Sequence, residues 1–133
     1  MNTFPNGKIN SNVFQDNSNL LRALLLLISK DKNIWDHEVR IFIHEGMALG
    51  YEKDFCENAL KHILRNSFID QTPPVFFNKE NASNILHVGI RIIKEDLNPH
   101  PMKIEFLEKI ALANNLWSYW NTIVYNKIPQ SDL

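Results

Sequence analysis

The chain has 133 residues, of which 44% are hydrophobic, with a formal net charge of −1 and a single cysteine, Cys56. A chain of this length can bury enough apolar surface to fold as one domain without a disulfide or a metal ion. The balanced charge argues against general electrostatic binding of nucleic acid. One cysteine rules out an internal disulfide and a zinc ribbon, so we expect a reducing, cytoplasmic compartment.

The N-terminal region predicts neither a signal sequence nor a membrane anchor. Residues 1–16 are rich in asparagine and lack a continuous apolar core, and we expect them to form a flexible arm. The most apolar run, residues 20–28, is interrupted by Arg22 and is about half as long as a membrane-spanning helix. We therefore expect a soluble protein without a membrane span, while attachment to a membrane surface stays open.

Apolar spacing and helix-ending residues predict six helices. The first is expected at residues 18–30, with leucines on more than one face, which is typical of a central helix. A second helix over 36–49 ends at Gly50, and a third is expected over 52–66. Asn78 and His100 are expected to cap the fourth and fifth helices, and the last helix is predicted at 117–127. The predicted buried stripes include Met47 in the second helix, Phe55 in the third and Trp120 in the last.

An offset of 65 residues aligns the two halves of the chain. Ser18-Asn19-Leu20-Leu21 falls on Ser83-Asn84-Ile85-Leu86, and Asp31 falls on Asp96, without any insertion. The sequence thus predicts one all-α domain of about six helices, built from two quasi-repeated three-helix units at 17–66 and 78–128. Residues 129–133 are assigned to a C-terminal tail.

The turns that follow the first and fourth helices collect carboxylates. Asp31, Asp36, Glu38 and Asp96 offer hard oxygen ligands of the kind that Ca²⁺ or Mg²⁺ prefers. The spacing does not make an EF-hand, because Trp35 and Phe42 occupy positions that would need oxygen ligands. The alternative is that the acidic groups stabilise the start of a helix through its dipole, with Asp31 fastening the turn. A weak divalent cation site is therefore a secondary hypothesis.

Two histidines on the second helix suggest a zinc enzyme, but their spacing argues against it. His37 and His44 lie seven residues apart, whereas a zinc protease places its two histidines four residues apart. We predict no catalytic residue. A small metal-dependent hydrolase using His37, His44 and Glu45 is kept as an alternative.

Aromatic residues gather at the start of the last helix. Trp117 and Tyr119 cannot both face the core together with Trp120, so they are candidates for a partner-binding or homodimer surface. The segment lacks the interleaved basic residues that stacking on nucleic acid requires. A purely structural oligomerisation domain is a further alternative.

The first turn resembles the conserved turn of the tellurite-resistance TerB-like family, which reads roughly Asp-Gly-x-Ile-Ser-x-x-Glu before an amphipathic helix that ends in Leu-Gly. Asp31, Ile34, Glu38 and Leu49-Gly50 fall on those places. The chain departs from it at Lys32, at Trp35 and, in the second turn, at Lys103, which stands where the glutamate is usual and weakens a symmetric metal site.

The resemblance implies an all-helical domain of two quasi-repeated units in a family tied to stress and tellurite resistance. It also implies a binding or scaffolding role with acidic residues that hold divalent cations. We therefore predict a non-catalytic interaction or sensing module with a protein partner.

Overall fold

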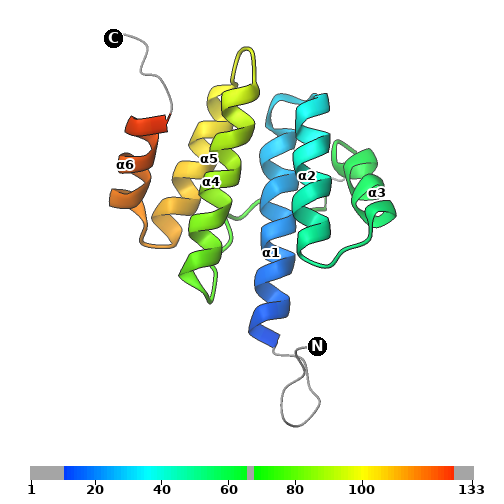
Figure 1. Cartoon of the computed structure of the whole chain (residues 1–133), viewed down its shortest axis with the longest axis horizontal. Helices are drawn as coiled ribbons and strands as arrows, with labels where there is room; N and C mark the ends of the chain where they lie inside the picture. Colours follow the sequence, from blue (N-terminus) through cyan, green and yellow to red (C-terminus); the bar gives the residue numbers. More distant parts are fainter. Residues whose placement is uncertain (1–10, 66–67, 128–133) are drawn as a thin grey trace.

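A computed structural model describes residues 11–65 and 68–127, with side chains described up to residue 124. The described residues form six α-helices and no strand, which confirms the predicted all-α domain (Figure 1). Among them, no helix has the length and apolar character needed to cross a membrane. The helices are α1 (Ser11–Ile28), α2 (Asp36–Ala48), α3 (Lys53–Ile63), α4 (Lys79–Glu95), α5 (Pro101–Ala113) and α6 (Trp117–Lys127), with a short 3₁₀ turn η1 (Ser29–Asp31) after α1.

Local sequence explains where most of the helices begin and end. The Asn78 side chain accepts a hydrogen bond from Glu80 N, and the His100 ring accepts one from Met102 N, so both predicted caps are confirmed. Gly50 follows α2 with a φ of 102°, a conformation that glycine adopts at little cost. These caps set the orientation of the helices on either side of each turn.

The start of α1 differs from the prediction. The helix begins at Ser11, not near Ser18, so part of the expected arm is helical. The cause is Asp16, which is 1% exposed and accepts hydrogen bonds from the backbone of Phe77 and Asn78 and from Asn81 Nδ2. This contact fixes the first turns of α1 against the start of α4. Residues 1–10, and the predicted tail at 129–133, lie outside the described part of the chain.

The helices lie side by side in the order α6, α5, α4, α1, α2, α3, with α1 and α4 in the centre (Figure 1). Five consecutive residues, from Leu24 to Ile28, are buried in α1, which confirms its central place. Its partner α4 buries Ile85, Leu86, Ile92 and Ile93 against the same core. Counted outward from the central pair, the order is α1, α2, α3 on one side and α4, α5, α6 on the other.

Contacts between equivalent residues show how the two units face each other. Lys103 contacts Glu38, 65 residues earlier, and Asn81 contacts Asp16 at the same separation. Both contacts join residues that the 65-residue offset of the sequence makes equivalent.

Two of the predicted buried stripes are rotated on their helices. In α2 the buried residues are Glu38, Ile41, Phe42 and Gly46, whereas Met47 is exposed. In α3 the buried residues are Cys56, Leu60 and Ile63, and Phe55 instead stacks on Tyr51 at the surface. The rotation of α2 matters more for the site, because it places the carboxylate of Glu38 in the interior.

Candidate functional site: a buried lysine between two acidic turns

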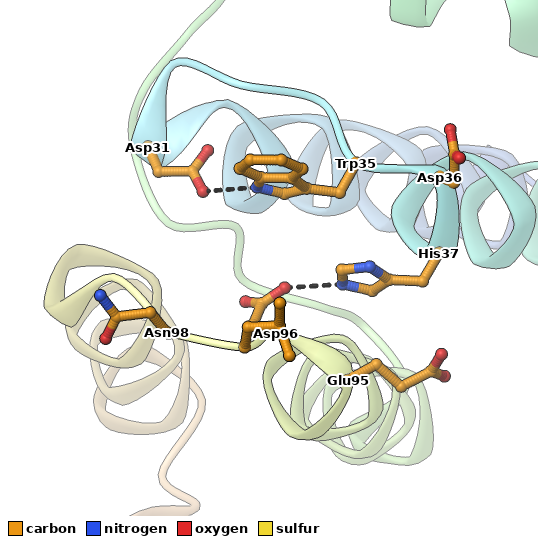
Figure 2. A pocket seen from close by; sticks show the side chains of 8 residues that line it. Asp31, Trp35, Asp36, His37, Glu95, Asp96 and Asn98 are labelled. Carbon is orange, nitrogen blue, oxygen red and sulfur yellow. Dashed lines mark hydrogen bonds and ion pairs between the residues drawn. The ribbon is translucent and has the colours of Figure 1, made fainter.

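The two acidic turns, which follow α1 and α4, lie at the same end of the molecule (Figure 1). One turn leads from α1 through η1 to α2, and the other leads from α4 to α5. Between them is a pocket of about 370 Å³, shown in Figure 2. It is lined by Asp31, Trp35, Asp36 and His37 from the first turn and the start of α2, and by Glu95, Asp96, Leu97 and Asn98 from the second turn.

Below this pocket, the ammonium group of Lys103 is completely buried among carboxylates. Its Nζ donates to Glu38 Oε2 at 2.5 Å and to Asp96 Oδ2 at 3.1 Å. Asp31 Oδ2 lies 3.4 Å from the same nitrogen. One cation from the second unit thus binds an acid from each of three segments, two of which belong to the first unit.

Glu38 reaches the cluster because it stands in the first turn of α2. Its Oε1 accepts a hydrogen bond from Trp35 N at 2.9 Å, so the same side chain closes the helix start and contacts Lys103. Burial raises the pKa of Glu38 and outweighs the opposing effects of Lys103 and the Trp35 amide. Its carboxylate is the most strongly desolvated acid of the cluster.

Asp31 is fastened by the turn that contains it. Lys32 adopts a left-handed conformation with a φ of 68°, and Asn33 N then donates to Asp31 Oδ1 at 3.0 Å. The Trp35 indole Nε1 donates to Asp31 Oδ2, also at 3.0 Å (Figure 2). Burial raises the pKa of Asp31, but these hydrogen bonds and Lys103 outweigh burial, so the net pKa is lowered.

Asp96 connects Lys103 to His37. While Oδ2 accepts from the ammonium, Oδ1 lies 2.6 Å from His37 Nε2, as Figure 2 shows. Both side chains are largely buried. His37 from α2 and Asp96 from the end of α4 therefore form a second polar link across the two units.

Lys103 keeps its charge in this environment. Burial lowers its pKa, but hydrogen bonds and charges from Glu38 and Asp96 outweigh burial, and the net pKa is raised. Three carboxylates nevertheless surround one ammonium, so the cluster stays acidic as a whole. Breaking a pair of this kind leaves an uncompensated buried charge.

The predicted cation ligands are partly brought together. Asp31, Glu38 and Asp96 converge, whereas Asp36 is exposed and lines the pocket outside the cluster. His37, Glu38 and Asp96 also present ligand atoms within 4.8 Å of one another. However, the Lys103 ammonium contacts two of these three side chains. A divalent ion about 3 Å from it would be repelled by on the order of 10 kcal/mol at an effective dielectric constant of 20. With Lys103 in place, these residues do not fit a divalent cation.

The residues of the hydrolase alternative are distributed over two places. His37 lines the pocket, but neither His44 nor Glu45 does. His44 Nδ1 lies 3.6 Å from Glu45 Oε2, and the same oxygen is 3.3 Å from Arg91 Nη1, at an exposed part of the surface. The structure does not assemble these three residues at the pocket.

The aromatic residues of α6 are divided between the core and the surface. Trp120 is buried, which confirms its predicted place in the core, while Trp117 and Tyr119 are both partly exposed. Tyr119 packs edge-on against His87 of α4, with a hydrogen bond between its hydroxyl and His87 Nε2. Trp117 and Tyr119 therefore lie at the surface, away from the pocket-lining residues.

Sequence reasoning missed the central role of Lys103 and the contact between Trp35 and Asp31. Lysine is rarely buried, so its place on the interior face of α5 is not apparent from composition. The repeat could have revealed it, because Lys103 is the equivalent of Glu38 and residues of opposite charge are favoured where equivalent positions meet. No family model matches the chain, and neither does a curated protein or a solved structure.

Proposed function

We propose that the protein is a non-catalytic, TerB-like interaction module that binds a protein partner through the pocket between its two inter-helix turns. The observation that carries the proposal is that two large apolar side chains, Trp35 and Leu97, are exposed at this pocket. The acids Asp31 and Asp96, which also line it, are already paired with buried Lys103. A surface of this kind suits contact with another protein.

Two residues of the pocket provide the apolar contact surface. The Trp35 side chain is 49% exposed although its indole nitrogen is held by Asp31, and Leu97 is fully exposed. Rigid aromatic side chains are the usual anchors of protein interfaces, because they bury a large area at low cost in conformational entropy. Trp35 is fixed in orientation before any partner arrives, which favours binding.

The paired state of the polar groups supports a binding role over a catalytic one. Lys103, Glu38 and Asp96 satisfy one another in the interior, and none of these three side chains except Asp96 lines the pocket. A general base or nucleophile needs a group that is available to a substrate at its reactive atom. The resemblance of the first turn to the TerB-like family supports the same assignment and ties it to stress response.

A site-specific photo-cross-linker at position 97 tests this proposal. Leu97 makes no buried contact, so replacing it leaves the fold intact. A cross-linker at position 112 is the matched control, because Leu112 is also exposed but lies near the end of α5. In native cells, position 97 should give a discrete cross-linked partner that Trp35→Ala abolishes. Equal products from both positions, or none from position 97, would contradict the proposal.

A second candidate is self-association through α6, which the exposure of Trp117 and Tyr119 favours. The double variant Trp117→Ala, Tyr119→Ala should then convert a dimer to a monomer in sedimentation experiments. A monomeric wild-type protein at high concentration would remove this candidate.

A further inference from the structure

We propose that the Lys103 ammonium is a built-in cation that closes the cluster of Asp31, Glu38 and Asp96 to divalent metal ions, so that replacing this lysine opens a metal site. The inference goes beyond the proposed function and does not depend on it, because it concerns Lys103 and its carboxylates and not the exposed apolar side chains.

The first argument is the geometry around the nitrogen. Three carboxylates from η1, α2 and the end of α4 place oxygens 2.5, 3.4 and 3.1 Å from Lys103 Nζ, with Asp31 the most distant. Ca²⁺ takes carboxylate oxygens at about 2.3–2.6 Å, so only small shifts would bring these oxygens to a metal at the same point. The position of the ammonium is thus the point at which an ion would be held.

The second argument is charge. Three carboxyl groups surround one ammonium, and His37 Nε2 lies against the outer oxygen of Asp96. Without the lysine, repulsion among the three acids would favour a divalent cation. Hard oxygen donors of this type select Ca²⁺, Mg²⁺ or Mn²⁺ over softer metals.

The third argument is the repeat. Glu38 and Lys103 stand 65 positions apart and contact each other, and Asp31 and Asp96, also 65 positions apart, both lie near the same ammonium. A strictly repeated sequence would place a fourth carboxylate where Lys103 stands. The lysine instead supplies a positive charge from within the chain.

The test compares wild-type protein with Lys103→Ala in thermal unfolding and in calorimetric titration with CaCl₂, MgCl₂ and MnCl₂. Wild-type protein should show no shift of Tm at millimolar metal. The variant should gain about 5 °C or more with at least one of the metals, because ligand binding to the folded state stabilises it. If the variant is unfolded in chelator, metal should restore its helical circular dichroism signal.

Two further variants make the result specific. Lys109→Ala removes an exposed lysine of the same helix. Like wild-type protein, this variant should show no shift of Tm with metal. Adding Glu38→Gln to Lys103→Ala removes one ligand and should weaken metal binding by about tenfold or more. The proposal is overturned if wild-type protein responds to metal as strongly as Lys103→Ala. It is also overturned if Lys103→Ala, folded or unfolded, gains nothing from any of the three metals.

Discussion

The two inter-helix turns carry the same acid but differ seven residues further on. Asp31 is followed by Glu38 in α2, and Asp96 is followed by Lys103 in α5. Both of the later side chains are buried and contact each other, and two identical acids at this place would repel each other. The difference shows how two similar units become one domain, since opposite charges at equivalent positions favour their pairing with each other.

The opposite end of α1 shows the same principle with weaker groups. There the equivalent residues are Asp16 and Asn81, and the amide of Asn81 donates to the carboxylate of Asp16. An acid is thus paired with a neutral donor near the start of α1 and with a cation near the start of α2. Variants of both pairs can measure what each difference contributes to the free energy of unfolding.

Replacing Lys103 should have the largest effect. Lys103→Met leaves the carboxylates of Glu38 and Asp96 buried without their cation, and we expect a loss of about 3–5 kcal/mol in the free energy of unfolding. Urea denaturation followed by circular dichroism measures it. Lys109→Met, on the exposed side of α5, should change stability by less than about 0.5 kcal/mol. A similar small loss for both variants would contradict the importance of the cluster.

Replacing Asp16 should have the next largest effect. Asp16→Ala removes the acceptor of two backbone N–H groups and of the Asn81 amide, and we expect a loss of about 2–3 kcal/mol. Chemical denaturation measures the loss, and Gln15→Ala, at the exposed neighbouring position, is the control. Amide hydrogen exchange at Phe77 and Asn78 should accelerate in the variant. Unchanged exchange would show that the contact does not hold the start of α4.

A third difference between the units concerns the fit of α2 against α3. A Cβ on Gly46 would lie 2.5 Å from the Sγ of buried Cys56, whereas the equivalent residue of α5 is Ala111. Gly46→Ala should therefore cost about 1–3 kcal/mol by overpacking. Thermal unfolding should show a smaller cost in a Cys56→Ala background, where the sulfur is absent. If Gly46→Ala lowers stability equally in both backgrounds, the contact with the Cys56 sulfur is not the cause of the loss.

Alkaline pH should produce the smallest effect. The pKa of Lys103 is raised in the folded protein above its ordinary value of 10.5, so its stabilising contribution is complete below that pH. The contribution should decline by at most about 1.4 kcal/mol per pH unit as the pH rises through the folded pKa. The difference in stability between wild-type protein and Lys103→Met should shrink accordingly above pH 10.5. A constant difference would mean that the ammonium is not the stabilising species.

Most of the helices could be predicted because they rest on local signals. The bounds of α5 and α6, the caps at Asn78 and His100 and the turn at Gly50 follow from short-range spacing and residue type. The early start of α1 could not be predicted, because Asp16 is stabilised by residues more than 60 positions away. Tertiary contact there overrides a weak local preference.

The candidate site was predictable in its acids but not in its cation. Asp31, Glu38 and Asp96 were identified from the composition of the turns, and the structure brings them together. Asp36 was predicted on the same ground, because it is an acid next to the same turn. It is the first residue of α2, however, and its side chain is exposed to solvent. The burial of Lys103 depends on how α5 is rotated against α1 and α4, and helical periodicity fixes such a rotation only roughly.

The most direct measurement is a double-mutant cycle between Glu38 and Lys103, with both replaced by methionine. If the pair joins the two units, the losses should not add, and the double variant should be at least about 2 kcal/mol more stable than the sum of the single losses implies. Additive losses, within about 0.5 kcal/mol, would contradict the account, because they would mean that the two side chains stabilise the fold independently.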